Sequence, residues 1–512
     1  MENYYSYLAF FLTVVFIIKL LHRRNRNSPP SPFCWPIIGH LHLCRPPLYK
    51  ALEALSLRYG PILSLKLGCR SFLVVSSPSA VEECFTKNDR VFANRPRIMA
   101  GDYLSYNYTA LALAPYGHSW RSLRRFAAVE IFSQTSLQKS SIIRREEVNS
   151  LLRHVFKASR GKPNKVQFSL RYLLSLLTVN IVTRMVTGEP YVGEEAAGTD
   201  VGKQRLESFL EIYFSSLIIN MCDFFPALRW IGYKGLEKSI IRLQAKRDEF
   251  FQRLIEESKQ KQTSSLSASN LVEVEKERTM IESLLSLRES EPEFYSDDVI
   301  KGMILTMYIA GSDTSETTLE WAISLLLNHP DVLQKVRAEI DDQVGHGRLL
   351  NELDLARLPY LHCVINETLR LFPTVPLLLP HFSTEDCTVG GFQIPRGTTL
   401  LVNAWFLHRD PKLWEEPTRF KPERFEATNR ETDGFKFVPF GIGRRSCPGA
   451  GMGQRIISLA LGALIQCFDW ERPGKEMVDM KPDTGGSALR KAKPLEAVCS
   501  PRHSMDTVLS QL

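Results

Sequence analysis

The sequence has 512 residues, of which 44% are hydrophobic and 23% charged, and 64 basic residues against 56 acidic ones give a net charge of +8. This composition excludes collagen-like, low-complexity and wholly disordered chains, and the modest charge permits an anionic membrane surface or an acidic partner without indicating nucleic-acid binding. The ten cysteines include no C-x-x-C pair, so they indicate neither a zinc ribbon nor a disulfide framework. At roughly 150 residues per domain, the length suggests three domains.

A membrane anchor is predicted at the N-terminus. Residues 4–21 are almost wholly apolar, and a helix of that length at ~1.5 Å per residue spans about 27 Å, close to the hydrocarbon core of a bilayer. Positive charges follow this run at 22–26, whereas a cleavable signal peptide carries them in front of it. Residues 1–27 are therefore predicted to be a single-pass anchor with a basic flank and a cytosolic C-terminal part. A buried core helix and a cleaved signal are the alternatives.

A hinge and a hairpin come next. Four prolines within residues 28–39 favour an extended, semi-rigid hinge. Residues 61–76 alternate between apolar and polar side chains and predict a β-hairpin. Helical patterns dominate from residue 119 onward, so the fold class is predicted to be mainly α with a small β portion.

The longest predicted helix begins after an N-cap at Ser296, with two aspartates in its first turn, and ends at His329 before a proline. Before it, the polar and serine-rich residues 257–280 predict a surface loop between helices. After it, residues 380–403 predict a second strand-rich stretch, with a turn at Gly390-Gly391.

Residues 310–315 of the long helix read AGSDTS. A glycine inside a helix costs about 1 kcal/mol relative to alanine, so Gly311 needs an explanation. Small residues let a flat ligand approach the backbone, and the Thr314 hydroxyl can bond the carbonyl four residues earlier and bend the helix. Alone, this stretch favours a notch for helix packing. Together with the segment 440–449, described next, it indicates a catalytic groove.

The segment 440–449 reads FGIGRRSCPG and precedes an apolar helical run. Its glycines allow tight turns and the close approach of a flat group. Backbone N–H groups at the start of that helix favour the thiolate form of Cys447, and Arg445 offers a cation for a carboxylate. A thiolate, a flat surface and a positive charge together suit haem iron and a haem propionate. A buried free cysteine in a glycine-rich turn is the alternative.

At every fixed position this segment matches Phe-x-x-Gly-x-Arg-x-Cys-x-Gly, the signature of the cytochrome P-450 family, and the whole chain resembles plant microsomal members. The resemblance implies the cytochrome P-450 fold, with residues 40–512 as a single haem-binding catalytic domain in place of three domains. It implies haem b (iron protoporphyrin IX) with Cys447 as the axial iron ligand. It also implies the endoplasmic reticulum membrane, O2, and electrons from NADPH through NADPH–cytochrome P-450 reductase.

The resemblance gives roles to further positions. Asp313 and Thr314 would relay protons to bound O2. A buried structural network is implied for Glu367, Arg370 and Arg424, where an i, i+3 spacing alone suggests a weak surface pair. Haem contacts, through the propionates or by packing, are implied for Trp120, Arg124, His381, Arg445, Phe440, Gly441, Gly449, Ala310 and Gly311. For His381 an ordinary surface position is the alternative.

An apolar, aromatic-lined pocket is expected to bind a small lipophilic substrate. The residues expected to line it are Tyr103, Tyr106, Ile218, Phe224, Val375, Leu377 and Leu489, with ordinary core packing as the alternative for each. The chain resembles the plant subgroup of isoflavone hydroxylases, lignan methylenedioxy-bridge synthases and xanthone synthases. This resemblance implies hydroxylation, or oxidative coupling or cyclisation, of a plant phenolic such as a flavonoid, lignan, benzophenone or xanthone precursor. A reductase-independent haem-thiolate isomerase or lyase and a non-catalytic haem-binding membrane protein are the alternatives.

Overall fold

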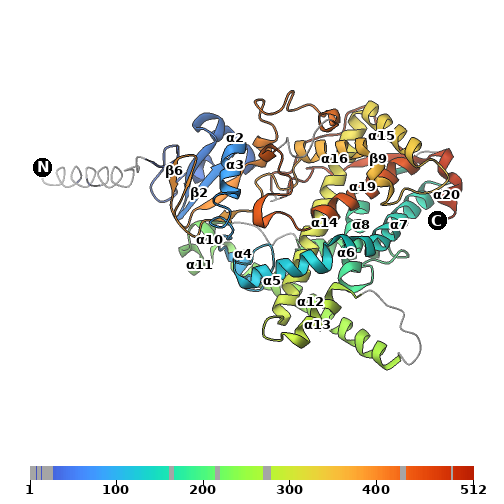
Figure 1. The fold of residues 1–512 in the computed structure, drawn as a ribbon, viewed down its shortest axis with the longest axis horizontal. Helices are drawn as coiled ribbons and strands as arrows, with labels where there is room; N and C mark the ends of the chain where they lie inside the picture. The colour runs from blue at the N-terminus through green and yellow to red at the C-terminus, as the bar shows by residue number, and fades with distance from the viewer. Residues whose placement is uncertain are drawn as a thin grey trace.

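The computed structural model describes residues 7, 13, 27–160, 166–213, 220–268, 278–426, 434–485 and 488–512. Figure 1 shows the N-terminal strands and helices at one end of the molecule and the C-terminus at the other, with helix α14 (Asp297–Asn328) between them. The predicted fold class is confirmed, because helices make up most of the structure and the strands form small sheets.

The longer helices carry the core and the short ones connect it. Their bounds are α2 Leu48–Tyr59, α3 Pro78–Phe85, α4 Met99–Leu104, α5 His118–Phe126, α6 Gln134–Lys139, α7 Ser141–Ser159, α8 Leu170–Thr187, α9 Asp200–Tyr213, α10 Met221–Phe224, α11 Ala227–Trp230, α12 Leu236–Ala268, α13 Met280–Ser290, α15 Pro330–Gln343, α16 Pro359–Leu371, α17 Ala404–Leu407, α19 Ala450–Cys467 and α20 Asp506–Ser510.

The main sheet has the strand order β1-β2-β7-β4. Its strands are β1 Ile62–Leu67, β2 Arg70–Val75, β7 Thr399–Val402 and β4 His381–Phe382. β1 and β2 form the predicted hairpin, and β7 runs parallel to β2. β4 is the last strand of this sheet, where His381 lies opposite Leu400 of β7, and isolated bridges join Phe382 to Ala93 and Asn94.

Two smaller sheets complete the β portion. β5 (Cys387–Val389) and β6 (Phe392–Ile394) pair across Gly390-Gly391, both with positive φ, which confirms the predicted turn. The third sheet has the order β3-β9-β8 and joins chain segments far apart in sequence. Its strands are β3 Val166–Ser169, β9 Glu496–Pro501 and β8 Phe468–Glu471.

Helix α14 is the predicted long helix and the centre of the core. The Ser296 hydroxyl accepts from the Val299 N–H at 3.4 Å, and the helix ends at His329, where Pro330 begins α15. α14 packs against α8, α16 and α19, and most of its side chains are buried. A helix covered on several sides by other helices has apolar residues on all of its faces. In α14 these apolar residues are interrupted by a few buried polar ones.

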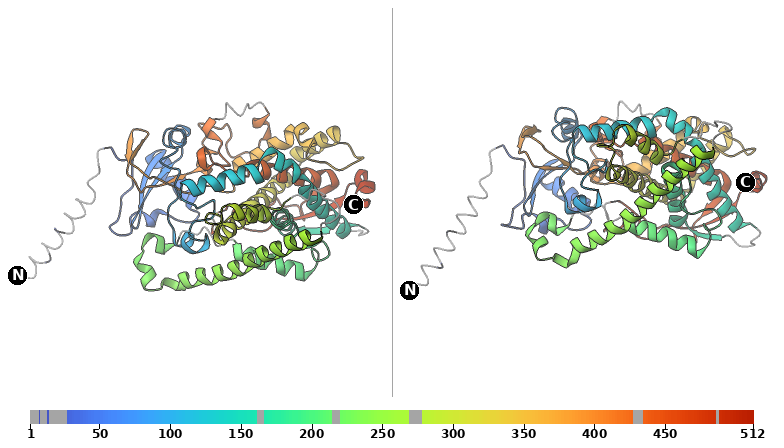
Figure 2. Two further views of the ribbon diagram at one scale, coloured as in Figure 1. Left: turned by 60° about the horizontal axis from the view of Figure 1, so that its bottom comes forward. Right: turned by 90° about the horizontal axis from the view of Figure 1, so that it is seen from below.

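The surface loop predicted over 257–280 is wrong for residues 257–268, because α12 continues through them to Ala268. These residues are rich in Glu, Lys, Gln and Ser, and the first three are good helix formers even where nothing buries them. Residues 269–277 lie outside the described residues. Figure 2 shows α12 as the long green helix, which packs against α4, α9, α13 and α14.

The predicted anchor over 1–27 lies outside the described residues, apart from Tyr7, Thr13 and Asn27. Within the ranges that the structure does describe, no helix is both long enough and apolar enough to cross a bilayer. The predicted hinge, 28–39, runs alongside the main sheet, where the Pro30 carbonyl accepts from the Ser64 N–H of β1 at 2.8 Å.

Candidate active site

Cys447 lies at the end of a tight loop that leads into α19. The loop turns at Gly441 and Gly443, whose φ angles of +67° and +72° favour glycine, and it closes where the Cys447 N–H donates to the Phe440 carbonyl at 2.8 Å. The Gly449 N–H, one residue before α19, hydrogen-bonds the Cys447 sulfur. These contacts fix one sulfur at the N-terminus of a long apolar helix.

The Cys447 side chain is accessible, yet protein surrounds it closely. Burial raises the pKa of its thiol, while the Gly449 N–H and the charge of Arg124 oppose the rise. The loop therefore presents an accessible sulfur with protein packed closely around it.

Arginines gather beside this cysteine. Arg445 donates from Nε to the Ala93 carbonyl and from Nη2 to the Ala114 carbonyl, both at 2.6 Å, and its guanidinium lies 4.4 Å from the centre of the Trp120 ring. Arg95 is only 7% exposed and donates to the Pro380 carbonyl at 2.6 Å. Backbone carbonyls and an aromatic face thus hold these guanidinium groups in place.

His381, 6% exposed, lies against the same group. Its Nδ1 is 2.9 Å from the Phe92 carbonyl, which can only accept, so Nδ1 carries the proton. Burial lowers the pKa of His381 well below its usual range, and Arg95 and Arg445 add to this effect. His381 is therefore neutral here, and the positive charge belongs to the arginines.

The arginines next to Cys447 repel one another. Burial, with Arg95 and Arg124, lowers the pKa of Arg445 to about 8, and burial lowers the pKa of Arg95 to about 10. Within the described ranges no carboxylate pairs with Arg95, Arg124 or Arg445. Since an arginine keeps its proton in proteins, such a cluster is strained until an anion neutralises it. The site is built to receive a ligand with negative charge.

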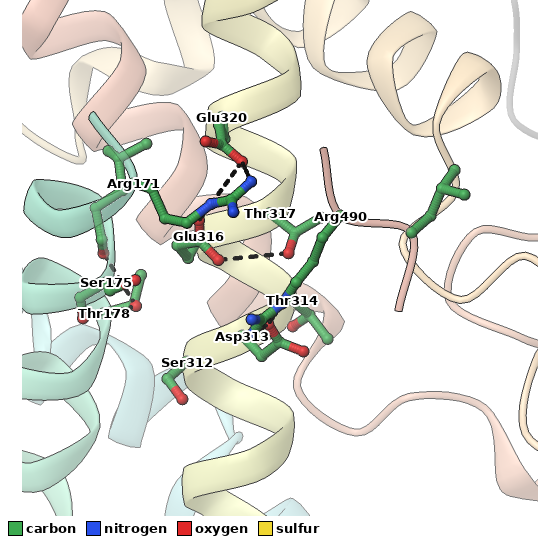
Figure 3. Close-up of polar contacts among 12 residues, drawn as sticks. Arg171, Ser175, Thr178, Ser312, Asp313, Thr314, Glu316, Thr317, Glu320 and Arg490 are labelled. Carbon is green, nitrogen blue, oxygen red and sulfur yellow. Dashed lines mark hydrogen bonds and ion pairs between the residues drawn. The ribbon is translucent and has the colours of Figure 1, made fainter. Parts of the chain in front are cut away.

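The predicted groove of α14 opens on one side only. Ala310 is exposed and Thr306, Ile309, Gly311 and Thr314 are half-buried, whereas most of the other residues of α14 are buried. The Thr314 hydroxyl donates to the Ala310 carbonyl at 2.6 Å. Arg490 donates from Nε to Asp313 Oδ1 at 2.7 Å and also from Nη2, so a cation holds the acid next to Thr314 (Figure 3).

The sequence predicts that Gly311 admits a flat ligand, and the structure gives this glycine a different role. A Cβ on Gly311 would lie 2.8 Å from Val182 Cγ2 of α8, so this glycine makes room for helix packing, and Ala310 is the residue that faces the open side. The same Cβ would lie 3.9 Å from Met452 Cε in the first turn of α19. At Gly311, α14 therefore lies next to the first turn of α19, which directly follows the cysteine loop, as the sequence predicts.

Glu367 and Arg370 pair one turn apart on α16, and both side chains are fully buried. Arg370 donates to both carboxylate oxygens at 2.7 and 2.8 Å, and Arg424 Nε donates to Oε1 at 3.0 Å. Arg370 also donates to the carbonyls of His408 and Pro417, each at 2.7 Å. The structure thus brings together the three residues of the implied network and ties α16 to the loops before Cys447.

The cytochrome P450 family profile matches residues 29–498. The chain belongs to the cytochrome P450 family. It is 48% identical to cytochrome P450 81Q32 of Catharanthus roseus over 98% of both chains. It is 45% identical to the (+)-piperitol/(+)-sesamin synthase of Sesamum radiatum, over 100% of this chain and 99% of that one, and 44% identical to an isoflavone 3'-hydroxylase of Medicago truncatula over 97% of both.

A solved structure agrees with this assignment. A zebrafish cytochrome P450 with progesterone superposes with a TM-score of 0.74 at 26% identity, covering 89% of this chain and 99% of that one. The protein is therefore a member of the cytochrome P450 monooxygenase family with the P450 fold, and the family implies haem iron and O2.

The residues of this P450 fit haem. The accessible Cys447 thiol lies just before α19, which packs against α14, and Arg95, Arg124 and Arg445 lie near it without a carboxylate partner among the described residues. Porphyrin propionates supply the missing negative charge. Arg95 belongs to this cluster although the sequence analysis missed it. Arg95 is one of two arginines flanking Pro96, and nothing in the sequence distinguishes it from Arg97; only the fold shows that Arg95 is buried.

Most of the predicted pocket residues have packing partners in the P450 core. The Tyr103 hydroxyl donates to Glu237 Oε1 at 2.6 Å, Tyr106 packs on the Phe251 ring, and Phe224 packs on Phe72 under the main sheet. Leu489 is 1% exposed and lies with Leu377 against Tyr49 and Trp405. These contacts are compatible with the core alternative, and the pocket role of these five positions stays a prediction.

Two predicted pocket residues remain. Val375 is half-buried and follows Thr374, whose hydroxyl lies 3.1 Å from that of Thr318, one turn beyond Thr314. Val375 therefore lies near α14, as does Leu489, whose carbonyl accepts from the Trp321 indole N–H of α14 at 2.6 Å. Ile218 lies outside the described residues.

Proposed function

We propose that this P450 is a monooxygenase that uses O2 and NADPH-derived electrons to hydroxylate, or oxidatively couple or cyclise, a lipophilic plant phenolic. The observation that carries the proposal is the accessible Cys447 thiol beside a cluster of arginines and the Asp313–Thr314 pair. The names of the relatives, a sesamin synthase and an isoflavone hydroxylase, support a phenolic substrate.

Cys447 would hold the haem iron, and Arg95, Arg124, Arg445, Trp120 and His381 would hold the propionates. When bound, haem b supplies an iron that activates O2, with electron density donated by the thiolate. A propionate would raise the pKa of His381, because the imidazole can donate from Nε2 only when it is protonated. Trp120 contributes its indole N–H and the face on which Arg445 rests.

Asp313 and Thr314 bind and transfer protons at this site. Arg490 donates to Asp313 Oδ1, which leaves Oδ2 as the oxygen that takes up a proton. The Thr314 hydroxyl can turn from the Ala310 carbonyl toward the open side of α14 and donate there. Burial raises the pKa of Asp313, and Arg490 opposes the rise, so the acid is a better proton acceptor than an ordinary aspartate.

The membrane and the reductase belong to the same proposal. The apolar run at 4–21 supports an anchor in the endoplasmic reticulum membrane with the catalytic domain on the cytosolic side. Exposed Arg121 and Arg125 of α5 and Arg444 of the cysteine loop offer a basic surface on the Cys447 side for an acidic reductase. Turnover should therefore slow as salt is added, and insensitivity to ionic strength would count against this docking surface.

Reconstitution in microsomes with a plant NADPH–cytochrome P450 reductase tests the function. A panel of flavonoids, lignans and benzophenones is supplied, and products are identified by mass. Gain of one oxygen atom indicates hydroxylation, and loss of two hydrogen atoms indicates coupling or ring closure. Product formed without NADPH or reductase would support an isomerase or lyase, and the absence of any product would support a haem carrier.

A further inference from the structure

A line of polar side chains lies between α14 and α8, behind the groove. Asp313, Glu316 and Glu320 follow one another at helical spacing, so their carboxyl groups share one face of α14. They are 9%, 3% and 1% exposed, respectively. Figure 3 shows Ser175 and Thr178 of α8 on the side that faces these acids. We call this line the α8–α14 seam.

The outer two acids of the seam each have a guanidinium partner. Arg490 holds Asp313, as described above. Arg171 donates from Nη2 to Glu320 Oε2 at 2.9 Å, and the Leu495 N–H donates to Glu320 Oε1 at 2.8 Å. Both carboxylates therefore have the partners that a buried charge needs.

Glu316, between them, accepts no hydrogen bond from a guanidinium. Its Oε1 is buried and accepts no hydrogen bond, and its Oε2 receives only a long one of 3.5 Å from the Thr317 hydroxyl. The nearest guanidinium nitrogen, Arg171 Nε, is 4.0 Å away. Burying an ionised carboxylate without hydrogen bonds costs much free energy, whereas burying a neutral carboxyl group in the same place costs far less.

Charged groups from three segments face Glu316 or its neighbour Glu320: Asp313, Arg171, Arg490 and Lys491. Lys491 is occupied elsewhere, since its Nζ donates to the Asp479 carbonyl and lies over the Trp321 ring. Burial, with Glu320 and Asp313, raises the pKa of Glu316 to about 8 against the effect of the two arginines. The raised pKa of Glu316 thus agrees with the poor hydrogen bonding of its carboxyl group.

We propose that Glu316 holds a proton in the resting enzyme and passes it to Asp313 through a bridging water, so that the Asp313–Thr314 pair is resupplied from inside the protein. This inference rests on the proposed monooxygenase function. The proton leaves Glu316 Oε1, crosses one water that hydrogen-bonds this otherwise unpartnered atom, and arrives at Asp313 Oδ2. A proton from solvent at the partly exposed edge of Arg171 then restores the Glu316 carboxyl, so the net charge of the seam is unchanged over a cycle.

Glu316 acts through Asp313 and touches no reacting atom, so it is a positioning residue. The first test therefore reads the protein itself. Infrared difference spectra of the purified full chain, loaded with haem, compare wild type with Glu316→Gln at neutral pH. We expect wild type to show a protonated-carboxyl stretching band that shifts in D2O and is absent from the variant. In Glu320→Gln, which removes a neighbouring carboxylate, the band should remain and titrate at lower pH.

The second test measures coupling. With reductase and substrate, Glu316→Gln should form about tenfold less product per NADPH, less than the ~100-fold that a group at the reacting atoms contributes. Its solvent isotope effect should rise, while substrate binding stays unchanged. Glu316→Asp, which restores a titratable group, should recover part of the coupling.

Two results would overturn the inference: identical infrared spectra for wild type and Glu316→Gln, or unchanged coupling in Glu316→Gln. Failure of the proposed function itself would look different. In that case the wild-type protein would form no product from any phenolic, and the infrared band would still decide whether Glu316 carries the proton.

Discussion

Arg490 and Asp313, 177 positions apart, form a partly buried ion pair in which Arg490 Nε donates to Asp313 Oδ1 at 2.7 Å. The pair joins the C-terminal segment to the middle of α14, so the acid next to Thr314 is held by a residue outside its own helix. Replacing Arg490 by Gln should let Asp313 take up a proton permanently, because a buried carboxylate without its cation is costly.

For Arg490→Gln we expect product per NADPH to fall by roughly ten- to a hundredfold, with more peroxide released. Arg502→Gln is the matched control, since Arg502 pairs with Asp341 at 2.7 Å, and neither belongs to the site residues described above. Product and NADPH consumption are measured together in reconstituted microsomes. Equal losses in the two variants would show that the Arg490–Asp313 pair is structural only.

Glu367→Gln should severely destabilise the fold. Breaking a fully buried pair by removing one charge costs about 3–5 kcal/mol. The Gln amide has one acceptor oxygen where the carboxylate has two, so either Arg370 Nε or Arg424 Nε would lose its acceptor. Glu416→Gln is the control, because Glu416 and Arg419 form a pair with the same spacing on the surface. Denaturant unfolding of both variants checks this prediction. A similar small change in each would mean that the buried network contributes little.

Gly311→Ala tests which side of α14 this glycine serves. The added Cβ would lie 2.8 Å from Val182 Cγ2, and overpacking of this kind costs roughly 1–3 kcal/mol. The double variant Gly311→Ala, Val182→Ala should recover most of the lost stability. If Gly311→Ala instead loses haem content and the second substitution restores nothing, the glycine serves the cofactor side.

Glu316 should make stability depend on pH. Its pKa rises from an ordinary 4.5 to about 8 on folding, so between these values the folded state binds more protons than the unfolded state. Stability from this group is therefore highest at low pH and falls as the pH rises through that window. Unfolding of wild type and Glu316→Gln at pH values near the two ends measures the difference. Wild type should lose more stability than the variant, and parallel curves would contradict the assignment.

The sequence predicts much of the local structure. The hairpin over β1 and β2, the capped helix α14 and the glycine turn between β5 and β6 all carry short-range signals, and each appears where expected. The cysteine loop likewise carries its geometry in its own glycines.

Other features depend on contacts between distant segments. Arg490 and Arg95 acquire their roles from residues far away in sequence, and Gly311 faces α8 instead of the open groove for the same reason. The end of α12 is missed for a different reason. Its polar residues are good helix formers, but without an apolar face the pattern predicts a loop.

The reduced carbon-monoxide spectrum of Cys447→Ser tests the central claim, that Cys447 is the axial ligand of a haem-thiolate enzyme. Cys69→Ser is the control, because Cys69 is exposed and lies in the turn between β1 and β2. Wild type and Cys69→Ser should both show the band of thiolate-ligated haem, and Cys447→Ser should lose it. A Cys447→Ser protein that keeps this band would contradict the account.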